Sequence, residues 1–265
     1  MTLRSARIAG GGGAVCLWVA TTLAAAPSAP FEDSLGQRLL ACTGCHGKEG
    51  RAAADGYYPR IAGKPAGYLY NQLRNFRDGR RHYELMAGLL APLGDDYLRE
   101  IAGHFAGLEV PYAAPLAAVE TAAMRAAGEG LVRRGDPGRG LPACTSCHGA
   151  AMTGRAPFIP GLLGLPRDYL NAQLGAWRNG KRRAAEPDCM AKIAKLLAPA
   201  DIGAVSAWLA SQPVPVPVPV AVAVAMVSAS TSTRKTAADG PLPIACGGVD
   251  DDAAAAPPPA PAPRR

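Results

Sequence analysis

The sequence predicts an all-α protein in which two small helical domains follow one another, over residues 31–110 and 120–212. Three observations predict this fold class. Apolar residues recur three and four positions apart, which is the period of a helix that buries one face. The alternating pattern of a strand is absent before the C-terminal tail. A unit of the sequence also occurs twice, with the same motifs in the same order.

The chain begins with a predicted signal peptide over residues 1–28. Arg4 and Arg7 precede an apolar run rich in glycine and alanine, which ends in small residues near Ala26. This is the layout of a secretory signal. An uncleaved membrane anchor is the alternative, because the run approaches the roughly 20 residues that span a bilayer.

The predicted helix at the start of the first domain leads into a motif of two cysteines and a histidine. In the first domain this helix is expected to place Leu35, Leu39 and Leu40 on one face. The motif then occupies residues 42–46, and it recurs at residues 144–148. The motif residues are Cys42, Cys45 and His46 in the first domain and Cys144, Cys147 and His148 in the second.

Two cysteines three apart, with a histidine directly after the second, form the attachment signature of c-type haem. Within one helical turn, both sulfurs can bond to the vinyl groups of haem while the imidazole faces the iron. Structural zinc is the alternative, because cysteine and histidine also hold zinc. Each copy lacks a fourth ligand nearby, so the spacing favours two covalently attached haem groups.

Helical spacing predicts two further helices in each domain. Aromatic and apolar residues recur three and four positions apart from Tyr68 to Phe76, and the same pattern runs from Tyr169 to Trp177. Each stretch marks an amphipathic helix. A last helix in the first domain begins near Asp95, since acidic residues favour the first turn of a helix.

A methionine in each domain is the predicted second iron ligand. In electron-transfer cytochromes c, a methionine sulfur opposite the histidine raises the reduction potential. Met86 lies 40 residues after the first motif histidine, and Met190 lies 42 residues after the second. Most methionines fill cores, but equivalent positions in both copies favour ligands. His82 and His104 are the rival ligands in the first domain, and the second domain has no histidine at the equivalent positions.

The chain carries a net charge of +7, which suits an electron carrier that docks onto acidic partners. Nucleic-acid binding also uses basic proteins, but no supporting motif is present. Two basic clusters lie just before the methionines, where they could balance haem propionates, form a docking face or simply end a solvated helix. They comprise Arg74, Arg77, Arg80 and Arg81 in the first domain and Arg178, Lys181, Arg182 and Arg183 in the second.

Residues 213–265 are predicted to form a disordered tail. Proline and valine alternate from Pro213, which favours an extended polyproline II spacer. The remainder is rich in alanine, serine, threonine and proline, and proline interrupts it too often for a membrane span.

A wider set of residues matches a known family. These residues are Gly36, Leu39, Cys42, Cys45, His46 and Gly47, then Tyr58, Pro59 and Gly63, and before the second motif Gly130, Gly135, Gly140 and Pro142. Each domain resembles a class I cytochrome c, and the pair resembles the dihaem cytochrome c4 family. The resemblance implies that each domain is a small helical bundle around one covalently bound haem c. It also implies that Pro59 and Pro160 direct a backbone carbonyl at the histidine ligand.

Two features depart from the family pattern. The segment between Gly180 and Met190 is three residues longer than its counterpart in the first domain, and residues 213–265 have no counterpart in the family. Cys189 and Cys246 are unassigned, and nothing in the sequence shows that they pair.

The resemblance implies a periplasmic dihaem cytochrome that carries single electrons between respiratory-chain components. The expected donor is a membrane quinol–cytochrome c reductase or a dehydrogenase, and the expected acceptor is a terminal oxidase, with peripheral membrane association left open. No catalytic acid, base or nucleophile set accompanies the haem motifs, so the protein is not expected to be an enzyme.

Two alternatives remain. One is an electron-accepting subunit of a dehydrogenase complex, for which the tail would suit tethering. The other is a dihaem enzyme, either a peroxidase or a thiosulfate-oxidising cytochrome, which needs one iron with an open or displaceable ligand. Cys189 beside Met190 keeps the second alternative open.

Overall fold

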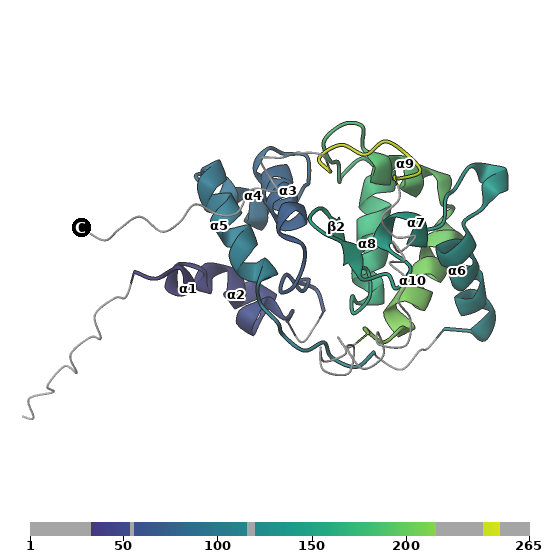
Figure 1. The fold of residues 1–265 in the computed structure, drawn as a ribbon, viewed down its shortest axis with the longest axis horizontal. Coiled ribbons are helices and arrows are strands. Elements are labelled where there is room, and N and C mark those ends of the chain that lie inside the picture. Colours follow the sequence, from purple (N-terminus) through teal and green to yellow (C-terminus); the bar gives the residue numbers. More distant parts are fainter. Residues whose placement is uncertain (1–32, 54–55, 116–119, 216–240, 250–265) are drawn as a thin grey trace, which may run out of the picture.

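Two groups of helices lie side by side in the computed structural model, one for each copy of the repeat (Figure 1). The structure describes residues 33–53, 56–115, 120–215 and 241–249. The predicted signal peptide and residues 216–240 and 250–265 of the predicted tail lie outside the described residues. The predicted all-α class is confirmed, because strand is confined to one short antiparallel pair within the part of the chain that is described.

Six helical segments make up the first group. They are α1 (Leu35–Arg38), α2 (Leu40–His46), a 3-10 turn (Lys48–Gly50), α3 (Ala66–Arg77), α4 (Glu84–Leu90) and α5 (Asp95–Ala106). Its core lies between α3 and α5 and includes Leu69, Phe76, Leu98, Ile101 and Phe105. The apolar spacing that predicted these two helices therefore supplies the core between them.

The second group repeats this plan with a longer first helix. Its elements are α6 (Ala122–Arg134), a 3-10 turn (Pro137–Arg139), α7 (Thr145–His148), β1 (Gly154–Arg155), β2 (Ile159–Pro160), α8 (Arg167–Arg178), α9 (Cys189–Leu196) and α10 (Pro199–Ser211). Its main core includes Val132, Leu170, Val205, Trp208 and Leu209. Within the described residues, no single helix has the length and apolar character of a membrane span. In that part of the chain, only α9 and α10 taken together are long and apolar enough, and these two helices meet at a bend of 111°.

The helix that leads to the first motif breaks at Leu39. This residue, with φ −82° and ψ 0°, ends α1 and precedes α2. Leu39 is 2% exposed and belongs to the first core, whereas Leu40 is 60% exposed. The expectation that both leucines share a buried face was wrong for Leu40, because the chain turns between them and begins a new helix.

Gly128 allows α6 to pack directly against the backbone of α10. A methyl group at Gly128 would lie only 2.0 Å from the carbonyl oxygen of Ala204. We expect Gly128→Ala to lower the free energy of unfolding by about 3 kcal/mol, because the helices would have to separate. Urea unfolding of the haem-loaded protein measures this change.

Gly130→Ala is the matched control on the same helix. Its added methyl group would meet only the flexible end of Arg134, at 3.0 Å. Since alanine favours helix more than glycine, this variant should be unchanged or more stable by up to about 1 kcal/mol. Equal losses in the two variants would contradict the close contact at Gly128.

The two groups meet through arginines of the predicted basic clusters. Arg81 and Arg182 form an isolated antiparallel bridge between the groups. Both guanidinium groups donate to Oε1 of Gln173, each at 2.7 Å, and both donate to Oε1 of Gln72, at 3.1 and 2.8 Å. Arg182 is only 4% exposed. Arg182 is therefore internal and Arg81 is half-buried, and both bind across the junction instead of ending a solvated helix.

Lys64 also crosses from the first group to the second. It is 5% exposed, and its Nζ donates to the carbonyl oxygen of Gly161 at 3.1 Å. Burial, reinforced by the charge of Arg60, lowers the pKa of Lys64 to about 8. The folded protein therefore releases this proton well before an unfolded lysine would.

Lys64→Met tests the pH dependence that follows. Below pH 8 both folded and unfolded states hold the Lys64 proton, and the burial penalty is fully present. Between about pH 8 and 10.5 only the unfolded state holds it, so the wild-type protein should gain stability relative to Lys64→Met by about 2–3 kcal/mol. Urea unfolding at pH 7 and pH 10 gives the difference. A constant difference would contradict the buried charge, and Lys192→Met, which removes an exposed lysine, is the control.

Candidate cofactor site

A cavity of about 1840 Å³ extends across both groups of helices. Pockets for one small ligand usually measure about 300–1,000 Å³, so this cavity has room for more than one such group. Every site residue predicted from the sequence lies on its wall. These residues are Cys42, Cys45, His46, Pro59, Met86, Cys144, Cys147, His148, Pro160 and Met190.

The motif histidines are buried and held in the same way in both groups. Nδ1 of His46 lies 2.7 Å from the carbonyl oxygen of Pro59, and Nδ1 of His148 lies 2.8 Å from that of Pro160. A carbonyl only accepts hydrogen bonds, so Nδ1 is the protonated nitrogen and donates, which leaves Nε2 able to bind a metal. Burial, as the largest cause, lowers the pKa of both imidazoles. The neutral form, which ligates metals, is thereby favoured.

The motif cysteines carry no disulfide. Burial raises the pKa of Cys42, and it raises the pKa of Cys144 to about 11. These sulfurs are therefore protonated thiols, as thioether formation with a vinyl group requires, since S–H adds across the double bond. Within the described residues, no group of three or more His, Cys, Asp or Glu side chains is placed to hold a metal ion such as zinc.

The two methionines occupy the first turns of equivalent helices. Met86 is the third residue of α4 and Met190 the second residue of α9, and both are half-buried on the cavity wall. Of the rival ligands, His82 also lines the cavity but is exposed, whereas His104 packs against Phe105 with 5.2 Å between ring centroids.

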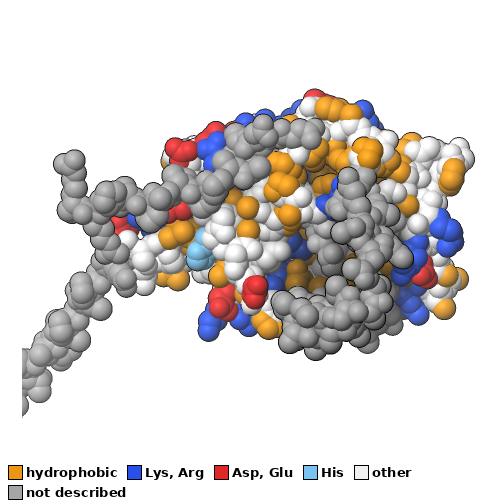
Figure 2. All heavy atoms as spheres, viewed as in Figure 1, with side chains coloured by type: hydrophobic (Ala, Val, Ile, Leu, Met, Phe, Trp, Pro, Cys, Tyr) orange, Lys and Arg blue, Asp and Glu red, His pale blue; other side chains and the backbone are white. Residues whose placement is uncertain are grey.

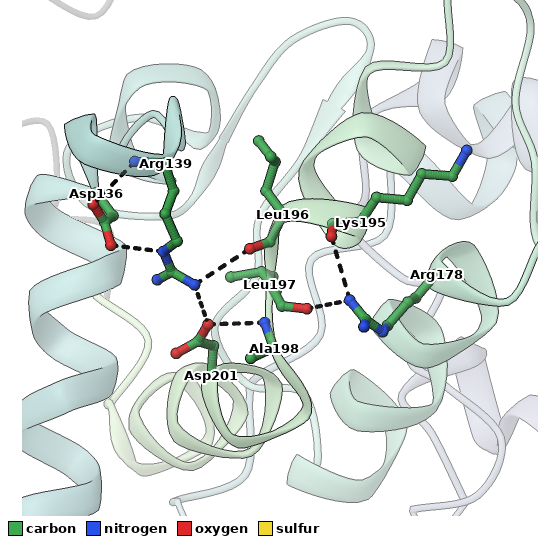
Figure 3. A network of polar contacts seen from close by, with 8 residues as sticks. All are labelled: Asp136, Arg139, Arg178, Lys195, Leu196, Leu197, Ala198 and Asp201. Atoms are coloured by element: carbon green, nitrogen blue, oxygen red, sulfur yellow. Dashed lines mark hydrogen bonds and ion pairs between the residues drawn. The ribbon is translucent and has the colours of Figure 1, made fainter.

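Equivalent arginines hold the turn that follows each methionine helix. Arg178 ends α8, and its Nη1 donates to the carbonyl oxygens of Lys195 at 3.3 Å and Leu197 at 2.5 Å (Figure 3). In the first group, Arg77 donates in the same way to the carbonyl oxygen of Leu93 at 3.0 Å. Two more members of the basic clusters thus fix the helices that carry the methionines, a role that sequence reasoning missed.

A second arginine holds the α9–α10 turn from its other side. Arg139 forms ion pairs with Asp136 and Asp201, each at 2.6 Å, and donates to the carbonyl oxygen of Leu196 at 3.3 Å (Figure 3). The side chain of Asp201 also accepts from the backbone N–H of Ala198 at 2.8 Å. The C-terminal end of α9 is therefore fixed by charged groups from two directions.

The start of α9 is fixed by a buried aspartate and a disulfide. Asp188 is 4% exposed and accepts from the backbone N–H groups of Ala191 at 2.9 Å and Ala184 at 2.7 Å. Cys189, the first residue of α9, is bonded to Cys246. The sequence left this pair unassigned and placed Cys246 in a disordered tail. The structure instead describes residues 241–249 against the second group, because the disulfide ties them there.

The chemistry of the cavity fits a covalently bound haem in each group. Each group offers two unbridged thiols, a neutral imidazole with a fixed tautomer and a thioether, and all of them line a cavity that is largely apolar. Hydrophobic side chains reach the surface near the junction of the two groups, with Lys and Arg scattered over the same face (Figure 2). A flat, mostly apolar macrocycle such as haem needs an apolar cavity of this kind to enclose it.

The chain is similar in sequence to two known proteins. The chain is 38% identical over 173 residues to a thiosulfate dehydrogenase electron acceptor from Thiomonas intermedia, which covers 65% of this chain and 79% of that protein. It is 35% identical over 176 residues to cytochrome c4 of Pseudomonas aeruginosa, which covers 65% of this chain and 84% of the relative. No protein-family model matches the chain.

A solved structure shares the fold. Reduced recombinant cytochrome c4 from Pseudomonas stutzeri superposes with a TM-score of 0.57 at 30% sequence identity. The match covers 66% of this chain and 94% of the solved one. The two groups of helices therefore correspond to nearly the whole of that protein.

Proposed function

The chain belongs to the cytochrome c4 family of electron-transfer cytochromes, and we propose that it carries single electrons in the periplasm with two haem c groups. The family implies haem c. The proposal of two haem groups rests on a duplicated set of residues that line the cavity. Each group of helices supplies two thiols, a methionine and a histidine whose Nδ1 donates to a proline carbonyl oxygen.

The residues divide the work in the same way in each group. The motif cysteines would hold the haem through thioether bonds, and His46 and His148 would ligate iron through Nε2 while the prolines fix their rings. Met86 and Met190 would supply the opposite ligands and raise the potential. Bound haem c supplies a one-electron couple, and the apolar wall keeps water away from it.

We infer that a dehydrogenase is the donor, with a thiosulfate dehydrogenase as the first candidate. A relative named as the electron acceptor of that enzyme supports this choice. Tyr57 and Leu85 support docking at the first group, because they line the cavity and are 62% and 66% exposed. The test compares the rates at which two enzymes reduce the haem-loaded protein: thiosulfate dehydrogenase supplied with thiosulfate, and a quinol–cytochrome c reductase. A slower rate with thiosulfate dehydrogenase would overturn this choice of donor.

A visible spectrum before and after addition of carbon monoxide tests the carrier function. We expect two haem groups per chain and a spectrum of the reduced protein that carbon monoxide leaves unchanged, because both irons would be closed by methionine. A shift in about half of the haem would reveal one open iron. That result would overturn the plain carrier in favour of a dihaem enzyme with peroxide or sulfur chemistry at the open site.

A further inference from the structure

Residues 241–249, here called the C-terminal strap, lie beside α9 at the junction of the two groups (yellow in Figure 1). The strap alternates in exposure. Leu242, Ile244 and Cys246 are half-buried and line the cavity, whereas Pro243 and Ala245 are exposed. The apolar side chains of the strap therefore line the same cavity as Met190.

Three contacts anchor the strap at its C-terminal end. Cys246 is bonded to Cys189, and the backbone N–H of Gly247 donates to the carbonyl oxygen of Pro187 at 2.8 Å. The side chain of Asn71, on α3 of the first group, donates to the carbonyl oxygen of Gly248 at 2.7 Å. The strap is thus tied to both groups of helices.

The longer segment before Met190 forms the surface on which the strap docks. A methyl group at Gly247 would lie 2.4 Å from the carbonyl oxygen of Ala185 and 2.5 Å from that of Glu186, so the two backbones are in direct contact. The insertion and the tail were separate departures in the sequence. In the structure they form one feature.

The first group provides an internal comparison. Leu85 precedes Met86 as Cys189 precedes Met190, and Leu85 is 66% exposed. Leu89, one turn further along α4, is 41% exposed. Among the described residues, no segment covers α4 as the strap covers α9. The two methionine helices therefore differ in two ways: among the described residues, only α9 is covered by the strap, and only α9 is bonded to it by a disulfide.

We propose that the C-terminal strap is a positioning device for Met190. The disulfide fixes the first residue of α9, the apolar side chains of the strap cover the cavity beside it, and Asn71 holds the cover against the first group. The strap thereby keeps Met190 on the second iron and excludes small exogenous ligands. This inference rests on the proposed role of Met190 as an iron ligand.

Imidazole binding to the oxidised, haem-loaded protein tests the proposal. The long-wavelength absorption band of methionine-ligated ferric haem reports loss of the methionine. Carrying the titration out in a Met86→His background makes the band report Met190 alone. We expect Cys189→Ser with Cys246→Ser to tighten imidazole binding at the second haem by about tenfold or more, because apparent affinity follows the fraction of open sites. Asn71→Ala should give a smaller change in the same direction.

Two control variants separate positioning from general stability. Leu85→Ser changes the residue that matches Cys189, and in a Met190→His background, where the band reports Met86 alone, it should leave imidazole binding at the first haem unchanged. Val132→Ala weakens the second core on α6 without touching the strap and should leave affinity at the second haem unchanged. Equal tightening in Val132→Ala, or no tightening in the double cysteine variant, would overturn the proposal. Absence of the methionine band from the second haem before any change to the strap would instead overturn the ligand role of Met190.

Discussion

Replacing Cys144 and Cys147 together with serine is expected to remove one of the two covalently bound haem groups. Serine cannot form the thioether, so haem in the second group would be held only by its axial ligands and would be lost on denaturation. Haem content per chain after denaturation, from the pyridine haemochrome spectrum and from the intact mass, should fall from two to one. The second group should also lose stability, because haem without thioether bonds can dissociate and leave its share of the 1840 Å³ cavity unfilled.

Two matched variants sharpen this expectation. Replacing Cys42 and Cys45 should remove the other haem, with the loss of stability in the first group instead. Replacing Cys189 and Cys246 should leave both haem groups attached, because these cysteines are already bonded to each other. Two haem groups still bound covalently after loss of Cys144 and Cys147 would contradict the attachment site.

Met190→His is expected to lower the reduction potential of one haem by a few tenths of a volt. Histidine is a harder donor than the methionine thioether and favours ferric iron. Such a fall is a sizeable part of the roughly 0.8 V range over which axial ligands set haem potentials. A redox titration followed by visible absorption should show one wave shifted and the other in place.

Met86→His should shift the other wave by a comparable amount. Met152→Leu is the control, because Met152 is 2% exposed within the second core and does not line the large cavity. If both waves stayed in place in Met190→His, the assignment of Met190 as an axial ligand would be wrong.

The cavity wall could be predicted from the sequence because its chemistry constrains residue order. The proposed haem attachment needs Cys42, Cys45 and His46 within one helical turn, and the repeat shows the same order again. The methionines follow from their equivalent distances after the motifs. Local spacing also predicted α3 and α8, since each buries one face.

The contacts between the groups could not be predicted in this way. Arg81 and Arg182 meet across the junction through Gln72 and Gln173, and neither periodicity nor a motif connects positions so far apart. The pairing of Cys189 with a cysteine 57 positions later has no local signal either.

The cysteines of this chain are expected to need two different redox states during maturation, one after the other. Under the proposed function, the four motif thiols have to stay reduced until they bond to haem, whereas Cys189 and Cys246 have to be oxidised. The six cysteines outside the predicted signal peptide allow about 15 complete pairings, and the exposed Cys45 is an accessible wrong partner. Because the strap lines the same cavity as the motifs, haem attachment should precede its closure. A host that oxidises exported thiols faster than it attaches haem should therefore accumulate misbridged chains.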